Sequence, residues 1–162
     1  MLDEEVSAVL LALIVVGGVF ALAQALRPNV VEPFSEIGVL GPKGKIGDYP
    51  RAVVAGEPFR LYLYVGNHEG RVMYYLIYVK LGNRSTVVNS TAPARAPVIA
   101  SYELILPHGR NATLPVTLSV DRPASDARLI FELWALNASS LRPVYWGRWL
   151  QLWLNVTAPP RA

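Results

Sequence analysis

The chain has 162 residues, contains no cysteine and carries a formal net charge of +3. The absence of cysteine excludes disulfides, zinc–thiolate sites and cysteine nucleophiles. The basic residues, twelve of which are arginine, are scattered singly along the sequence. A nucleic-acid-binding protein usually gathers them into a stripe, so we expect no nucleic-acid partner.

Residues 6–26 form the most apolar stretch of the chain, with Ser7 and Gln24 as the only polar side chains. As a helix this stretch would span about 30 Å, the thickness of the hydrocarbon core of a bilayer. A core helix would show a polar stripe. A cleaved signal peptide would begin with basic residues, although Ala21-Leu22-Ala23 does resemble a cleavage site. We interpret residues 1–5 as a cytoplasmic leader and residues 6–26 as an uncleaved transmembrane helix in membrane lipid.

The side of the membrane on which the remaining residues lie is indicated by two opposing signals. The acidic leader weakly favours a cytoplasmic domain under the positive-inside rule. However, five of the seven asparagines stand in N-x-S/T sequons, where chance would place fewer than one. They are Asn83, Asn89, Asn111, Asn137 and Asn155. Asparagine and Ser/Thr can also coincide in turns. We favour N-glycosylation, which predicts a single-pass cell-membrane protein with an extracytoplasmic C-terminal domain.

The remaining sequence divides by its pattern. Residues 27–56 are rich in Gly and Pro and predict a connector with one short strand at 37–40. From residue 57 to 157 apolar and polar residues alternate, and residues 158–162 form a tail. The predicted strands are 59–65, 73–81, 99–106, 113–120, 127–136 and 145–156. About seven strands with closely spaced turns predict an all-β fold, an antiparallel β-sandwich of immunoglobulin-like or cupredoxin-like type.

The alternation assigns a face to each strand residue. We expect Leu63, Ile77, Leu118, Phe131 and Leu152 to point into the core. Pro115 cannot donate a ladder hydrogen bond, so its strand is predicted to lie at a sheet edge. Glu103 and Glu132 are expected to point to solvent. The outward set contains six aromatic residues: Tyr62, Tyr64, Tyr74, Tyr78, Trp149 and Trp153.

Residues 33–82 resemble an archaeal family of uncharacterised membrane proteins with a C-terminal extracytoplasmic β-domain. The matching residues follow an LGPxGK…YP…GE…NHEG pattern: Phe34, Glu36, Leu40 to Pro42, Gly44-Lys45, Tyr49-Pro50, Gly56-Glu57 and Asn67 to Glu69. The resemblance implies a location in the archaeal cell envelope and implies no activity. Longer relatives carry several membrane helices before this domain.

No catalytic, metal or cofactor site is expected. His68, in Asn67-His68-Glu69, could bind a metal, but we favour a role for these three residues in fixing a turn through hydrogen bonds to the backbone. A blue-copper centre would need a cysteine. Ser101, His108 and Asp121 contain the residue types of a hydrolase triad. No nucleophile-elbow pattern surrounds the serine, so we predict that the protein is not an enzyme.

Two features indicate interaction with other proteins. Gly17, Ala21 and Ala25 recur at four-residue spacing, which lets two helices approach closely in lipid. Alanine is also common in any apolar helix, and both explanations stay open. The outward aromatic residues suggest an interface, unless residues 27–56 fold over them.

The sequence therefore predicts a non-catalytic accessory or scaffolding subunit of a larger cell-envelope complex. It would contact other membrane-protein subunits through the transmembrane helix and the outward aromatic residues. Secretion or N-glycosylation machinery are candidates. The alternative is a subunit of an extracellular filament or surface layer, in which apolar helices form the core.

Overall fold

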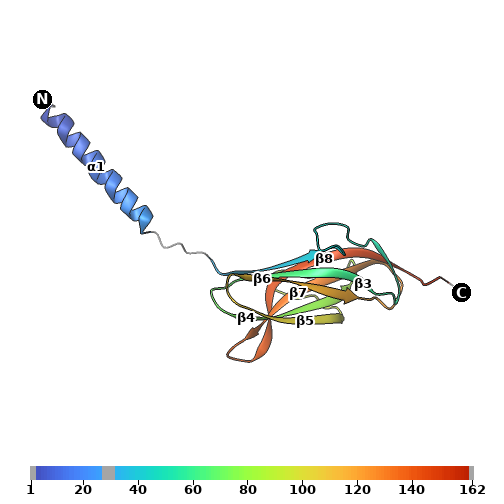
Figure 1. Ribbon diagram of the computed structural model, residues 1–162. Helices are drawn as coiled ribbons and strands as arrows, with labels where there is room; N and C mark the ends of the chain where they lie inside the picture. The colour runs from blue at the N-terminus through green and yellow to red at the C-terminus, as the bar shows by residue number, and fades with distance from the viewer. Residues whose placement is uncertain (1–2, 27–31, 161–162) are drawn as a thin grey trace. The chain divides into compact units, whose positions relative to one another are not determined.

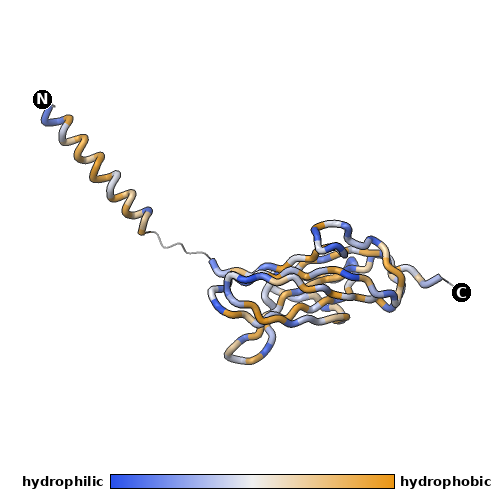
Figure 2. Tube along the Cα trace, viewed as in Figure 1, coloured by the Kyte–Doolittle hydropathy of each residue, from blue (hydrophilic) through white to orange (hydrophobic). Residues whose placement is uncertain are grey.

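The structure is a computed structural model that describes residues 3–26 and 32–160. The chain divides into two compact units, Met1–Glu32 and Pro33–Ala162. The first unit contains helix α1 (Glu4–Ala25), whose first turn carries Glu4 and Glu5. Negative charge at that end complements the helix dipole. Figure 2 shows that the chain is mostly hydrophobic along α1 after its first turn.

None of the residues of α1 is buried, and within the described ranges it is the one helix long and apolar enough to cross a membrane. A helix that is hydrophobic all round is typical of a protein core or of a membrane span. The helix has the length and composition of a membrane anchor or of a signal sequence. The prediction of an apolar N-terminal helix is therefore confirmed.

The second unit is an immunoglobulin-like β-sandwich, as the alternation predicts (Figure 1). Its described strands are β1 (Phe34–Leu40), β2 (Ala52–Val54), β3 (Phe59–His68), β4 (Met73–Gly82), β5 (Val98–Leu106), β6 (Arg110–Leu118), β7 (Ala124–Asn137) and β8 (Arg142–Thr157). One sheet has the order β1-β3-β6, and the other has the order β2-β8-β7-β4-β5. Neighbouring strands are antiparallel except for β2 and β8, which are parallel. Both β1 and β2 belong to these sheets, so the sandwich begins before residue 57.

The core lies between the two sheets and contains the residues assigned to it by alternation. Leu63, Ile77 and Phe131 are completely buried, Leu118 is almost so, and Leu152 packs against them at the margin. Burial of this apolar surface is the main favourable term in folding.

The predicted edge position of Pro115 is confirmed, because β6 is the end strand of the described β1-β3-β6 sheet. One boundary differs from expectation. Residues 66–68 continue β3 instead of forming a turn, because Gly66 and Asn67 pair with both β1 and β6. The turn begins after His68. The buried Asn67 side chain accepts a hydrogen bond from the Glu69 backbone N–H at 2.9 Å and donates to the Arg71 carbonyl at 2.8 Å, so its predicted role in fixing the turn is confirmed.

Candidate interaction surface

The six aromatic residues proposed as an interface lie on two different sheets. Tyr62 and Tyr64 belong to β3, in the three-stranded sheet, whereas Tyr74, Tyr78, Trp149 and Trp153 belong to β4 and β8, in the five-stranded sheet. The six residues therefore do not form one continuous face. Alternation indicates which side of a strand faces outward, but it does not indicate to which sheet the strand belongs.

On the outer face of the three-stranded sheet, Tyr64 lies beside a residue that has no side chain. Tyr64 lies opposite Gly38 on β1, and a Cβ added to that glycine would lie 3.5 Å from the Cβ of Tyr64. The Tyr64 hydroxyl donates to Glu36 at 3.0 Å. Burial and the Glu36 carboxylate together raise the pKa of Tyr64. Tyr64 is thus a half-buried residue with a fixed hydroxyl.

The outer face of the five-stranded sheet is partly covered by residues 83–97, which we call the covering segment. Val88 and Ala94 of this segment pack on Ile130 of β7, and Trp149 lies against the same cluster. Sequence reasoning offered residues 27–56 as a cover. On the five-stranded sheet the covering segment takes this role. On the three-stranded sheet Gly44, which belongs to residues 27–56, does lie beside Tyr62, where an added Cβ would be 3.9 Å from the ring.

A buried ion pair lies beneath the covering segment. Lys80 Nζ is 2.9 Å from Glu132 Oε2, and Glu132 is completely buried. The expectation that Glu132 points to solvent is therefore wrong. The Glu132 side chain does point away from the core between the two sheets, but the covering segment lies over it and excludes solvent. Lys80 donates to the Ala94 carbonyl at 2.8 Å, and Glu132 accepts from the Ala94 backbone N–H at 2.5 Å, so both charges bind the segment that buries them.

Arg128 connects the covering segment to Trp149 and Trp153, two of the three tryptophans of β8. Its guanidinium carbon lies 5.8 Å from the ring centre of Trp149 and 5.4 Å from that of Trp153. The same guanidinium donates to the Thr86 carbonyl and to Gln151. Cations above aromatic faces are attracted by the ring quadrupole. Trp153 remains 43% exposed at the end of this stack.

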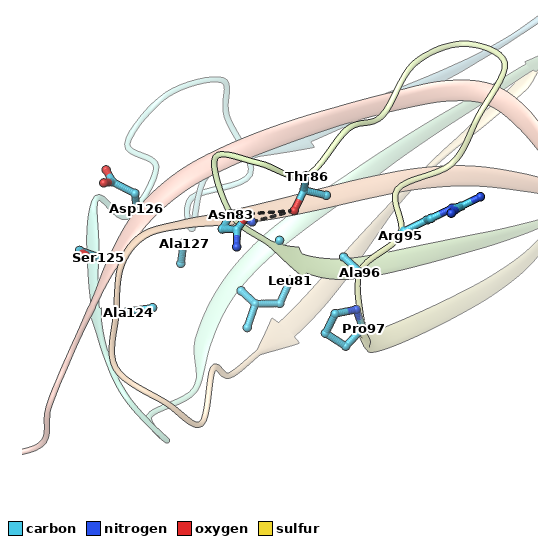
Figure 3. Close-up of a pocket in the computed structure, with 11 residues that line it drawn as sticks. Leu81, Asn83, Thr86, Arg95, Ala96, Pro97, Ala124, Ser125, Asp126 and Ala127 are labelled. Carbon is cyan, nitrogen blue, oxygen red and sulfur yellow. Dashed lines mark hydrogen bonds between the residues drawn. The ribbon is translucent and has the colours of Figure 1, made fainter.

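A shallow hollow of about 340 Å³ opens between the start of the covering segment and the residues around Asp126 (Figure 3). Hydrogen bonds join Asn83 to Thr86 at its wall, and Arg95 points away from the other labelled side chains. Arg84 and Asp126 form an ion pair of 3.1 Å at the rim. The hollow has a mainly apolar lining and is open to solvent, and this openness suits contact with a polymer or a neighbouring protein better than enclosure of a small molecule.

The residues considered for catalysis or metal binding take part in structural contacts. His68 stacks on Phe34, with 4.5 Å between ring centroids, and His108 Nδ1 accepts from the Gly70 backbone N–H at 3.0 Å. Ser101 lies within β5, opposite Tyr78. Within residues 3–26 and 32–160, no group of three or more His, Cys, Asp or Glu residues is placed to hold a metal ion.

The other residues singled out in the sequence are accessible. All five sequon asparagines are exposed. Gly17, Ala21 and Ala25 lie on α1 and are exposed, and a Cβ added to Gly17 would meet nothing within 4 Å. Sequence reasoning did not single out Lys80 and Arg128, whose buried side chains hold the covering segment to the sheet. Each is a lone basic residue inside an apolar alternating strand, and this pattern could have marked both as buried partners.

The fold and the surface define a class of protein: an immunoglobulin-like β-sandwich that follows an N-terminal apolar helix. Residues 28–153 match the family model described as "Domain of unknown function (DUF1616)". The chain therefore belongs to the DUF1616 family. This match confirms the predicted resemblance to a family of uncharacterised proteins. No curated protein sequence matches the chain.

The solved structures to which the chain is similar are distant from it in sequence. A β-glucosidase from Listeria innocua has a TM-score of 0.51 and 13% identity over 79% of this chain, which spans 16% of the enzyme. The CARDB domain of a Pyrococcus furiosus protein, solved with di-metal ions, has a TM-score of 0.49 and 9% identity over 77% of this chain and 89% of that one. At these identities the similarity concerns the fold alone.

Proposed function

We propose that the chain is a non-catalytic, membrane-anchored accessory or scaffolding subunit of a larger complex in an archaeal cell envelope. Helix α1 holds it in the cytoplasmic membrane, and the β-sandwich lies outside. Its partners are other membrane-protein subunits, which it contacts through the helix and the outer aromatic residues. Secretion and protein-glycosylation machineries are the candidate complexes.

The observation that carries the proposal is the combination of a lipid-compatible helix with a separate sandwich that exposes every sequon asparagine. A bulky glycan requires an exposed acceptor on the extracytoplasmic side of the membrane. The space between the two sheets is filled with apolar side chains. The hollow near Asp126 is open to solvent and suits contact with a polymer or a protein. These features favour binding over catalysis.

The extracytoplasmic location is tested by the intact mass of the protein from its natural host. We expect a mass above that of the polypeptide by one or more glycans. A mass equal to that of the polypeptide alone would contradict the glycosylation and remove the main argument for the orientation.

The role of α1 is tested by replacing Gly17 with Leu and purifying the protein in mild detergent. Added bulk at a close helix contact should reduce the amount of any co-purifying subunit, while the helix stays apolar enough to insert. Val19→Leu is the matched control, because residue 19 lies on the other side of the helix. Equal co-purification of both variants would show that the small residues do not mark a contact.

A further inference from the structure

The sequons at Asn83 and Asn89 lie in turns that already bring the asparagine and the hydroxyl residue together. Asn83 Oδ1 accepts from Ser85 N at 2.9 Å and from Ser85 Oγ at 2.7 Å. Asn89 Oδ1 accepts from Thr91 N and from Thr91 Oγ1, both at 2.9 Å. Such side-chain hydrogen bonds hold an Asx turn. Both asparagines belong to the covering segment and are exposed.

Asn137 has the same kind of turn at the tip of the β7–β8 hairpin, which projects from the sandwich (Figure 1). Its Oδ1 accepts from Ser139 N at 2.9 Å and from Ser140 N at 3.0 Å. The asparagine is the last residue of β7, and the residues that follow it are not part of a ladder until Arg142. Asn137 itself pairs with Arg142 at the end of the ladder, but the rest of its sequon lies in the turn. Three of the five sequons therefore extend into exposed turns.

The other two sequons are parts of paired strands. Asn111 lies in β6 opposite Gly66. Asn155 lies in β8, which has β2 on one side and β7 on the other, and its backbone N–H donates to the Arg51 carbonyl at 2.8 Å. The hydroxyl of this sequon is also engaged, because Thr157 Oγ1 donates to the Val53 carbonyl at 3.2 Å.

N-glycosylation joins C1 of a sugar to the asparagine Nδ2 and breaks the bond from that C1 to a phosphate oxygen of a lipid-linked oligosaccharide. The Nδ2 loses a proton, and the lipid phosphate departs. Since the sequon is defined by two residues, the transferase has to contact the amide and the hydroxyl together. A sequon in a turn presents both groups at once. A sequon in a ladder must first give up its backbone hydrogen bonds, which requires local opening.

We infer that Asn83, Asn89 and Asn137 accept glycans on the folded protein, whereas Asn111 and Asn155 accept them only before their strands have paired. The inference rests on the proposed extracytoplasmic location and adds which sites are used and when. Asn111 is the one sequon of the three-stranded sheet. On a protein modified after folding, the outer face that carries Tyr62 and Tyr64 consequently has no glycan on its own strands.

The test uses the full chain, produced in a host without N-glycosylation and purified in mild detergent. It is incubated with membranes that contain the natural transferase and a lipid-linked oligosaccharide, and glycopeptides are quantified over time by mass spectrometry. The turn sequons should be modified at least about tenfold faster than the strand sequons, because strand opening has to precede transfer. Peptides from a digest of the same chain should accept glycans at all five sites at similar rates.

Two variant sets sharpen the comparison. Ser85→Ala should abolish modification of Asn83, whereas Thr86→Ala should preserve it, although Thr86 Oγ1 also contacts Asn83 Oδ1 at 3.3 Å. Leu63→Ala destabilises the core, so it should raise the rates at Asn111 and Asn155 several-fold and leave Asn89 unchanged. A folded chain that is modified at Asn155 as fast as at Asn89 overturns the inference alone. Failure of all five sites to accept glycans, in peptides as in the chain, overturns the proposed glycosylation together with it.

Discussion

Lys80 and Glu132 form an ion pair of 2.9 Å on the outer face of the five-stranded sheet, where both side chains are buried. Charges on the outer face of a sandwich usually meet water. Here the covering segment excludes water and supplies the backbone groups of Ala94 to both partners. Within the described residues no buried side-chain nitrogen or oxygen lacks a hydrogen-bond partner. The covering segment is therefore an integral third layer over this part of the sheet.

Replacing Lys80 with Met should strongly destabilise the protein. The variant leaves the Glu132 carboxylate buried without its counter-charge, and breaking a buried pair in this way costs about 3–5 kcal/mol. The loss would appear as a lower midpoint in urea unfolding of the purified chain. A change below about 1 kcal/mol would mean that the covering segment opens readily and lets water reach Glu132.

The double variant Lys80→Met/Glu132→Gln is the control for that measurement. The glutamine carries no charge, and its side-chain oxygen can still accept from the Ala94 backbone N–H. We expect the double variant to lose less stability than the sum of the two single variants, because residues in contact are energetically coupled. Additive losses would contradict a direct interaction between the two charges.

The adjacent residues Leu63 and Tyr64 separate core packing from surface packing. Leu63 is completely buried, and its replacement by Ala should cost about 2–5 kcal/mol of unfolding free energy. Tyr64 lies on the outer face and keeps part of its surface in water, so Tyr64→Ala should cost distinctly less. Thermal unfolding of both variants in detergent measures the difference. Equal losses would show that the outer face of β3 is enclosed as tightly as the core.

Gly147 is a point at which the sheet and the covering segment approach closely. Its φ of +69° is unfavourable for other residues, and a Cβ there would lie 2.5 Å from the Ser90 carbonyl oxygen. Gly147→Ala should therefore strain β8 and push residues 89–91 outward. We expect faster hydrogen exchange in the covering segment and a stability loss of about 1–3 kcal/mol. Gly70→Ala is the control for the backbone term, since Gly70 also has positive φ but no atom within 4 Å of its added Cβ. Similar losses from both variants would mean that the contact with Ser90 adds nothing.

Much of the fold follows from the period of two in the sequence. That period placed Leu63, Ile77, Leu118, Phe131 and Leu152 on the inward side, and all five pack in the core. The proline at position 115 marked an edge strand because it lacks a backbone N–H. The short strand β2 was not predicted, since its pairing with β8 is a contact between segments about a hundred residues apart.

The surface was harder to predict than the core. Alternation assigned Glu132 to the outward side correctly, but only the path of the covering segment determines that this side is buried there. The same limit applies to Tyr62 and Trp149, which face outward on opposite sheets. Contacts between loops and sheets depend on tertiary structure, which a local pattern does not encode.

Tyr145 provides a test of the covering segment by pH. Its hydroxyl donates to the Asn89 carbonyl at 2.8 Å. Burial, together with the negative charge of Glu132, raises the pKa of Tyr145 to about 12 from an ordinary value of 10.0. The unfolded chain therefore releases this proton at a lower pH than the folded chain does. Above pH 10 the unfolded state binds fewer protons, so the free energy of unfolding falls as the pH rises towards 12.

Tyr145→Phe removes this titrating group and should give a shallower fall in stability between about pH 10 and pH 12. Tyr75 and Tyr102, whose pKa values are also raised by burial, contribute the same slope to both proteins, so the difference isolates Tyr145. The measurement is urea unfolding at a series of pH values. Below pH 9 the variant should show only the loss of the hydrogen bond to Asn89. Parallel pH profiles for the two proteins would show that the Tyr145 hydroxyl is in contact with water, and that the covering segment does not seal this end of the sheet.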